Sequence, residues 1–336
     1  MFTAKLGCRM ASVLSSKVDR ALRGRCQTNR SQRLRLQHRF DQLAGLLHVD
    51  VAPETTSEFS AGSLAAERLD FAMIFGFLKQ RRRRWLRAQP FPKDWLRAIK
   101  RNVPFFRRLS ASDQAELLGH VRVFLAEKRF EGCGGLELTD DICVTIAAQA
   151  CLLLLHRKTD YFPRLLTILV YPSTYMVEEK RPVEGPVWEE GRMARLGETG
   201  RRMGTVVLAW DAAKSGAADP ADGKNLVLHE FAHQLDYENY AADGAPALAT
   251  REQQLSWRKV MRTEFASLRA AEETGTPTLL DTYGATDPAE FFAVSTEAFF
   301  ERPCALRAHH PKLYAELQRY FRQDPLEYSA ARMKAN

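Results

Sequence analysis

Residues 225–236 read Asn-Leu-Val-Leu-His-Glu-Phe-Ala-His-Gln-Leu-Asp, and they contain the pattern His-Glu-x-x-His at His229, Glu230 and His233. The segment is rich in apolar residues and has neither Gly nor Pro, which predicts an α-helix. One helical turn separates the two histidines, so both imidazoles lie on one face and can bind a single Zn²⁺. Glu230 then lies beside the open coordination position, as in a metal-dependent hydrolase.

A structural interpretation of the same segment competes with the metal site. In that alternative, the segment is a core helix whose two histidines are satisfied by hydrogen bonds, with a surface Glu between them. Chance supplies the pattern only about 0.01 times in a chain of this size and composition, and the helical context lowers that figure further. The metal site is therefore the favoured interpretation.

Catalytic zinc needs three protein ligands, so a third must lie elsewhere in the chain. After His233 the next histidines are His309 and His310, and residues 234–242 contain no further His or Gly. Acidic residues are therefore the candidates. Asp236 and Glu238 are too close along the same helix to close a tetrahedral site easily.

A second helix is expected to begin near residue 287, with Asp287 as its N-cap and Pro288 at its first position. Glu290 lies one turn into this helix and is a candidate ligand. It also completes a capping box with Asp287, in which it only returns a hydrogen bond to the cap. Glu297, on about the same face, is the rival ligand or an acceptor for a zinc-bound imidazole. The motifs alone leave this choice open.

Four segments together resemble the Mlc titration factor A family of zinc-dependent peptidases, also known as the DgsA anti-repressor family. They read HEFAHQLD, YGATDPAEFFAVSTEAFF, YPSTYMV and VVLAWDAA. The resemblance covers roughly residues 73–328, and the spacing of Tyr283 and Glu290 is also similar to the catalytic domain of anthrax lethal factor. It implies that Glu290 is the third zinc ligand and that Tyr283 contributes to catalysis.

The resemblance implies an α+β, zincin-like metallopeptidase fold, mainly helical, with a small mixed sheet beside the His-Glu-x-x-His helix. The residue pattern is consistent with this fold. Residues 165–171 and 204–210 are short β-branched apolar runs that predict strands. Residues 142–155 predict a buried helix, and a capped amphipathic helix is expected from residue 112 to residue 125.

The expected mechanism uses one Zn²⁺ per chain, held by His229, His233 and Glu290, which lowers the pKa of a bound water toward about 7. Glu230 then accepts the water's proton and delivers it to the leaving amine, and Tyr283 donates a hydrogen bond to the tetrahedral oxyanion. The resemblance implies aminopeptidase-type activity on a peptide or protein substrate. The alternative is a non-catalytic anti-repressor that binds an Mlc-type transcriptional repressor.

The net charge of +8 is concentrated near the start of the chain. Residues 1–40 carry +9, residues 41–78 carry −5 and residues 79–108 carry +11, which leaves −7 for residues 109–336. A nucleic-acid surface on the main domain is therefore not expected, because its Lys and Arg would have to lie there. The run Arg81–Arg84 beside Trp85 is interpreted as a solvated flank, with RNA or anionic lipid binding as the alternative.

Residues 1–72 are expected to be a disordered extension or a stretch outside the native protein, with an organellar targeting segment as the alternative. Residues 73–108 form a basic flank in this interpretation, and residues 109–330 form the metallopeptidase domain. No apolar stretch is long enough to predict a membrane span. Six cysteines without a Cys-x-x-Cys pair indicate reduced thiols and a cytoplasmic location.

Overall fold

The computed structural model describes residues 76–328, except residues 174, 183–187, 196, 200–203, 220 and 242, and it describes side chains outside residues 174–203. The extension expected at residues 1–72 lies outside the described residues. The expected boundary between residues 108 and 109 stays a prediction.

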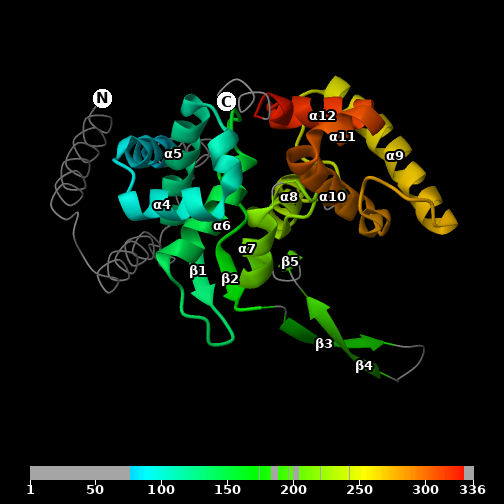
Figure 1. Cartoon of the computed structure of the whole chain (residues 1–336), viewed down its shortest axis with the longest axis horizontal. Coiled ribbons are helices and arrows are strands. Elements are labelled where there is room, and N and C mark those ends of the chain that lie inside the picture. The colour runs from blue at the N-terminus through cyan, green and yellow to red at the C-terminus, as the bar shows by residue number, and fades with distance from the viewer. Residues whose placement is uncertain are drawn as a thin grey trace, which may run out of the picture. The chain divides into compact units, whose positions relative to one another are not determined.

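A helix over residues 76–88 precedes the labelled elements of Figure 1. The remaining helices are α4 (Lys93–Asn102), η1 (Pro104–Arg108), α5 (Ala111–Glu127), α6 (Asp140–Leu152), α7 (Trp210–Ala218), α8 (Leu226–Asp236), η2 (Tyr237–Asn239), α9 (Arg251–Thr274), η3 (Thr282–Ala285), α10 (Pro288–Glu301), α11 (Pro303–His309) and α12 (Pro311–Phe321). The strands are β1 (Arg129–Gly132), β2 (Thr167–Tyr171), β3 (Tyr175–Pro182), β4 (Trp188–Arg195), β5 (Gly197–Thr199) and β6 (Thr205–Ala209). Among these helices, none combines the length and the apolar character that crossing a bilayer requires.

The central sheet has the order β1-β2-β6-β5. Strands β1, β2 and β6 are parallel, whereas β5 pairs with β6 in the antiparallel direction. Strands β3 and β4 form a separate antiparallel pair. A mainly helical α+β fold with a small mixed sheet is therefore confirmed.

The strand and helix boundaries differ from the expected ones by a few residues. Strand β2 begins at Thr167 rather than at residue 165, and β6 ends at Ala209 because Trp210 opens α7. Helix α5 starts before the expected residue 112, since the Ser110 hydroxyl accepts the amide of Asp113 and makes Ser110 the N-cap. The true cap therefore lies two residues before the Ser112 that the capping pattern favoured.

Helix α8, which carries the His-Glu-x-x-His pattern, packs against elements on two sides. It contacts α6, β6 and α10, and Figure 1 shows α6 and α10 on opposite sides of it. Phe231 is fully buried and packs against Phe124 and Phe162, with ring centroids 5.7 and 4.9 Å away. This burial explains why the segment is apolar on most of its surface.

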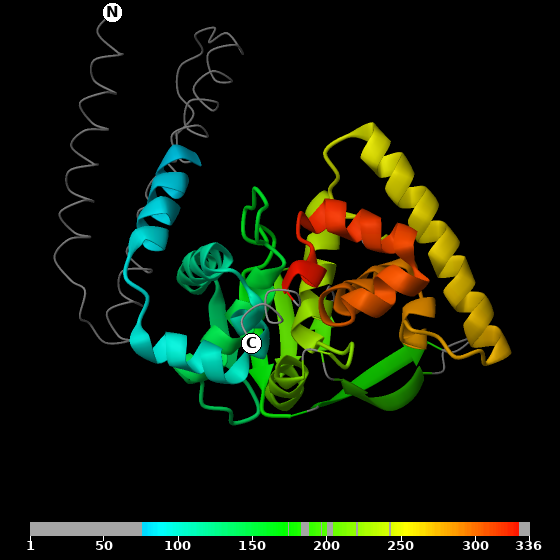
Figure 2. The same ribbon diagram turned by 45° about the horizontal axis from the view of Figure 1, so that its top comes forward.

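Helix α10 packs against the C-terminal helices through a cluster of aromatic side chains. Phe292 lies between Trp257 of α9 and Phe321 of α12, with centroid distances of 5.6 and 6.5 Å. Figure 2 shows α9 running past α10 and α12. Aromatic pairs in these geometries stabilise a core beyond the area that they bury, so the cluster stabilises the packing of α10.

One arginine of the basic run is part of the folded structure. The Arg83 side chain is 1% exposed, forms two hydrogen bonds to the Glu127 carboxylate at 2.7 and 2.8 Å, and reaches Asp160 at 2.5 Å. Its guanidinium also lies over the ring of Tyr161, 4.6 Å from the centroid. Arg83 therefore departs from the solvated flank expected for residues 81–84, because it joins the helix over residues 76–88 to α5.

We predict that Arg83→Ala lowers the free energy of unfolding by about 2–3 kcal/mol, since removing one partner leaves buried charge uncompensated. The loss is smaller than is typical of a fully buried pair because Asp160 is half exposed. The control is Arg84→Ala on the exposed side of the same helix, with an expected change within about 0.5 kcal/mol. Chemical denaturation of both variants measures the difference, and equal losses would contradict the structural role of Arg83.

Candidate metal centre

The two histidines of α8 face the same side of the helix. Their ring centroids are 4.9 Å apart, and their side chains are 14% and 11% exposed for His229 and His233. Asn225 caps the helix, since its side-chain oxygen accepts the amide of Leu228 at 3.0 Å. The cap sets where the helix begins, and the spacing of four residues then places one imidazole above the other.

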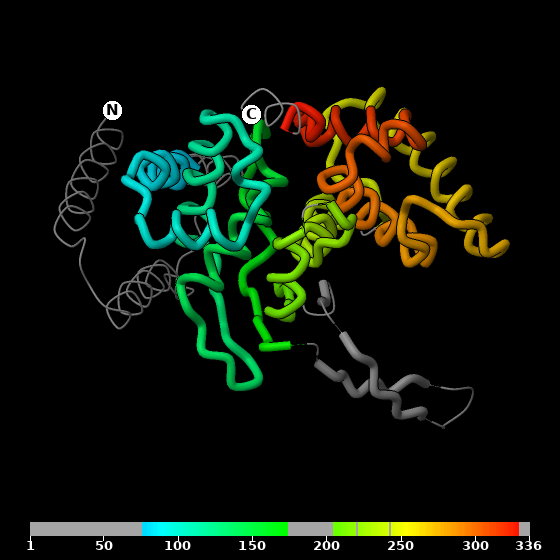
Figure 3. The backbone as a smooth tube through the Cα atoms, in the orientation of Figure 1, coloured from blue at the N-terminus to red at the C-terminus, as the bar shows by residue number. Residues whose placement is uncertain are grey.

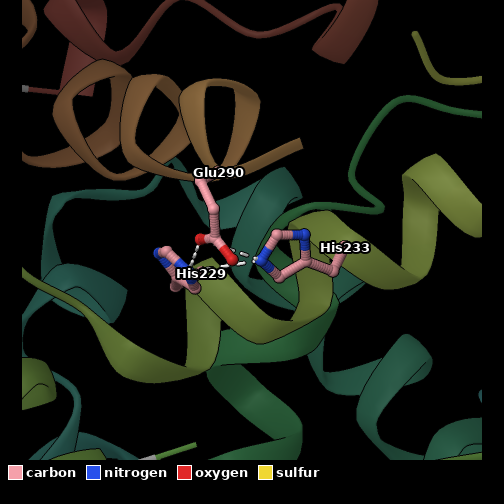
Figure 4. Close-up of side chains that lie close together, drawn as sticks. All are labelled: His229, His233 and Glu290. Carbon is pink, nitrogen blue, oxygen red and sulfur yellow. Dashed lines mark hydrogen bonds and ion pairs between the residues drawn. The ribbon is translucent and has the colours of Figure 1, made fainter. Parts of the chain in front are cut away.

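Glu290 reaches the histidines from the first turn of α10. Its Oε2 lies 2.9 Å from His229 Nε2 and 3.4 Å from His233 Nε2, as Figure 4 shows. The Asp287 carboxylate caps α10 by accepting the amides of Ala289 and Glu290. Asp287 and Pro288 thus occupy the positions expected of them, and the Glu290 carboxylate points across the helix interface.

Helices α8 and α10 are far apart along the chain. Figure 3 follows the chain from α8 out along α9 and back to α10, which lies beside α8. The long excursion through α9 is what lets a residue 61 positions after His229 lie against it.

Glu297, two turns further along α10, holds the first histidine in place. Its Oε1 lies 2.8 Å from His229 Nδ1, and its Oε2 accepts the backbone amide of Asn225 at 2.5 Å. Of the two roles open to Glu297 in the sequence, its contacts favour that of acceptor for the imidazole, because they lie on the side of His229 away from Glu290.

Three atoms of the kind that bind metals meet between α8 and α10: His229 Nε2, His233 Nε2 and Glu290 Oε2. Glu297 can only accept, so His229 Nδ1 carries the proton and His229 Nε2 presents a lone pair. That lone pair lies 3.3 Å from His233 Nε2 and 2.9 Å from Glu290 Oε2. With the proton of His233 also on Nδ1, three lone pairs converge there, and the set of two imidazole nitrogens and one carboxylate oxygen fits a divalent metal ion.

The pKa values express the same requirement for positive charge. Burial lowers the pKa of His229, but the hydrogen bonds to Glu290 and Glu297 outweigh it and raise the pKa to about 10. Burial also acts to raise the pKa of Glu290, yet both histidines hold it well below its usual range. Without a metal the site therefore captures a proton, and a metal ion must displace that proton to bind.

Glu230 and Tyr283 flank the three converging side chains. Glu230 follows His229 on α8 and is 5% exposed. Tyr283 lies in η3 with its side chain 56% exposed, and its ring centroid is 6.2 Å from that of His229. The structure thus places one buried carboxylate and one accessible phenol beside the candidate metal centre.

The other candidate side chains face elsewhere. Asp236 is fully buried, and its Oδ2 accepts the amide of Gly244 at 2.9 Å, while burial raises its pKa to about 6. Burial also raises the pKa of Glu238. His309 is exposed on α11, and His310 Nδ1 lies 2.8 Å from Glu264 of α9.

Sequence reasoning missed two residues that support the centre. The backbone N–H of Asn225 donates to Glu297, and its side-chain oxygen caps α8. Its side-chain nitrogen donates to Glu301 at 3.1 Å. An Asn immediately before an apolar helical run is an N-cap signal and could have identified it. The contribution of Glu301, whose pKa burial raises to about 9, had no comparable signal.

Gly244 joins α8, α9 and α10. It has a φ of +72°, its amide donates to Asp236 and its carbonyl accepts the Trp257 indole at 3.0 Å. A Cβ added to Gly244 would lie 2.2 Å from the carbonyl oxygen of Pro288, the first residue of α10. Only glycine therefore fits between the end of α8 and the start of the helix that carries Glu290.

Comparison with known proteins gives a consistent set of relatives. The model of the family described as Glucose-regulated metallo-peptidase M90 matches residues 77–322. A protein of Synechocystis sp. named "Uncharacterized protein slr2042" is 39% identical over 245 residues, which cover 73% of this chain and 89% of the relative. Mlc titration factor A of Klebsiella pneumoniae is 31% identical over 235 residues, covering 69% and 86%, and that of Salmonella arizonae is 29% identical over 238 residues, covering 69% and 92%.

We predict that Gly244→Ala lowers the free energy of unfolding by about 3 kcal/mol or more and weakens metal binding, because it displaces the start of α10. Gly275→Ala is the matched control, since Gly275 has a φ of +63° but open space where a Cβ would lie. Its expected cost is about 1 kcal/mol, from the left-handed backbone alone. Urea unfolding and metal content measure both, and equal effects would refute the close packing at Gly244.

We predict that Glu290→Ala loses the metal, whereas Glu297→Ala retains it with an affinity reduced by about 10- to 100-fold. The difference arises because Glu290 faces the shared lone pairs of both imidazoles and Glu297 faces the far side of one. Zinc titration of the purified variants against a competing chelator measures both affinities. If only Glu297→Ala lost zinc, the assignment of the two carboxylates would be reversed.

Proposed function

This chain belongs to the family of glucose-regulated M90 metallopeptidases, and we propose that it is a zinc-dependent peptidase with aminopeptidase-type activity. The observation that carries the proposal is the convergence of His229 Nε2, His233 Nε2 and Glu290 Oε2 within 3.4 Å of one another. Three ligand atoms in such an arrangement suit a cation, and a catalytic zinc keeps a further coordination position for water.

Zinc is the metal that suits this donor set. Two imidazole nitrogens and one carboxylate oxygen are the ligands of many catalytic zinc sites, and one ion per chain fills the group. Bound there, zinc supplies a Lewis acid that polarises a carbonyl and lowers the pKa of water toward about 7. Glu297 orients His229 for this role through its hydrogen bond to Nδ1.

Glu230 is proposed as the general base. Its position next to His229 and its low exposure place a carboxylate in a poorly solvated environment beside the ligands. A carboxylate there can accept the proton of the attacking water and deliver it to the amine that leaves when the peptide bond breaks.

Tyr283 is proposed to stabilise the oxyanion of the tetrahedral intermediate. Its exposed side chain lies next to His229, on the accessible side of the site. A phenolic hydroxyl can donate a hydrogen bond to developing negative charge. Removing one such donor typically costs about 10²–10³-fold in kcat, which is the loss expected of Tyr283→Phe.

A second function is supported by the relatives rather than by the site. Relatives of about 30% identity carry the name Mlc titration factor A. We therefore propose binding of an Mlc-type repressor as the alternative output, with or without hydrolysis. Direct nucleic-acid binding is not proposed, since residues 109–336 carry a net charge of −7.

A cytoplasmic location is part of the proposal. Among the described residues, Cys133, Cys151 and Cys304 form no disulfide, which suits a reducing compartment. We also retain the proposed division into an extension at residues 1–72, a basic flank at residues 73–108 and a metallopeptidase domain at residues 109–330.

We predict that Glu230→Gln lowers hydrolysis of aminoacyl reporter substrates by about 10²–10⁴-fold, because the amide cannot accept the water's proton. Zinc content and any binding of a purified Mlc-type repressor are expected to stay unchanged. Glu272→Gln, at an exposed position of α9, is the control and should keep full activity. Undiminished hydrolysis by Glu230→Gln, with zinc bound, would contradict the proposed base.

A further inference from the structure

A second group of metal-ligating side chains lies apart from the centre at His229. Asp113 and Glu116 belong to the first two turns of α5, and His156 lies in the turn that follows α6. One ligand atom from each of the three lies within 4.8 Å of the other two. None of these residues has a part in the proposed peptidase mechanism.

The hydrogen bonds of His156 fix which ring nitrogen carries the proton. His156 Nδ1 lies 3.0 Å from the backbone carbonyl oxygen of Arg322, which can only accept, so Nδ1 is the donor. In the neutral imidazole, Nε2 then presents a lone pair. That lone pair faces Asp113 Oδ1 at 2.8 Å and Glu116 Oε2 at 3.9 Å. Acceptors therefore converge, as they do at the first centre.

Glu116 is held in position by two further donors. Its Oε1 accepts the backbone amide of His156 at 3.0 Å and lies 3.2 Å from His120 Nε2. His120 is 2% exposed, and its Nδ1 lies 2.8 Å from the Tyr161 hydroxyl, which can donate a hydrogen bond to that nitrogen. A neutral His120 thus donates to Glu116 through Nε2 and leaves Glu116 Oε2 directed toward His156.

The second cluster has the same arrangement of donors and acceptors as the first centre, built from different residues. In the first centre, His229 donates Nδ1–H to Glu297 and presents Nε2 to the carboxylate of Glu290. In the second cluster, His156 donates Nδ1–H to the Arg322 carbonyl and presents Nε2 to the carboxylate of Asp113. A metal-bound histidine nearly always donates its other ring nitrogen in this way, and its carboxylate partners are themselves hydrogen-bonded. His120 is such a partner for Glu116.

We propose that Asp113, Glu116 and His156 form a second, structural site for a divalent transition metal, for which Zn²⁺ is the probe. One nitrogen and two carboxylate oxygens leave room for water as a further ligand on the partly exposed side. The site joins three segments of the chain: the start of α5, the turn after α6, and the end of α12, which contributes the Arg322 carbonyl.

The backbone around the site supports a structural role. His156 and Arg322 have φ values of +60° and +55°, in the left-handed region that residues other than glycine rarely adopt. Such conformations persist where surrounding interactions hold them. Phe321, next to Arg322, stacks on Phe299 of α10 with ring centroids 5.7 Å apart. The proposed site therefore holds the end of α12, which packs against the helix that carries Glu290.

The competing explanation is a proton in place of the metal. Burial lowers the pKa of His156, but Asp113 and the Arg322 carbonyl raise it above its ordinary value, so an imidazolium would also satisfy the cluster. The two explanations differ in metal stoichiometry, which does not depend on catalysis.

The test is the zinc content of the full chain after saturation and removal of loosely bound metal. We expect two zinc ions per chain for the unchanged protein, one for His156→Asn, one for Glu116→Gln, one for His233→Ala and none for His233→Ala/His156→Asn. Asn is chosen at residue 156 because it tolerates a positive φ. His309→Asn, at an exposed histidine of α11, is the control and should retain two.

A zinc content that His156→Asn and Glu116→Gln leave unchanged would overturn the proposal. The test also separates this site from the peptidase centre. If the peptidase assignment were wrong, His233→Ala would not change the zinc count, yet His156→Asn would still lose one ion.

Thermal stability provides a second measurement that a folding defect cannot imitate. In the His233→Ala background, zinc at about 100 times its Kd should raise Tm by about 5 °C, because the ion binds only the folded state. The same addition to His233→Ala/His156→Asn should leave Tm unchanged. A Tm of His233→Ala that does not respond to zinc would overturn the proposal.

Discussion

The structure around the candidate metal centre depends on a positive charge at the contact between α8 and α10. Two imidazole nitrogens and a carboxylate oxygen meet there within 3.4 Å of one another. Burial makes this arrangement costly unless a positive charge is shared among them. The surrounding side chains serve that arrangement: Glu297 fixes the tautomer of His229, Asn225 starts the helix at the right residue, and the aromatic cluster around Phe292 keeps α10 in place.

Local patterns predicted the elements that carry the centre but not their long-range partners. The apolar segment around His229 predicted helix α8, and Asp287 with Pro288 predicted the start of α10, because helix ends depend on adjacent residues. The role of Glu290 stayed ambiguous, since a capping box uses the same residue types at the same spacing. Its position against His229 follows from packing across 61 residues, which no local pattern encodes.

Arg83 shows the same limit for charge patterns. Four consecutive arginines suggest a solvated surface, yet one of them is buried because Glu127 and Asp160 lie where it projects. The cluster around His156 likewise draws on three segments, and none of them has a motif of its own. The sequence shows directly where basic residues occur along the chain, whereas the burial of Arg83 depends on partners 44 and 77 residues away.

The spacing of Glu290 and Glu297 on one helix has a consequence for folding accuracy. Both carboxylates contact the same imidazole from opposite sides, so a slip of α10 by one turn, about 5.4 Å, would break both contacts together. A chain with misaligned helices would then fail to assemble the three-ligand set at all. The candidate metal centre can therefore form only in a chain whose tertiary structure has the correct register of α10 against α8.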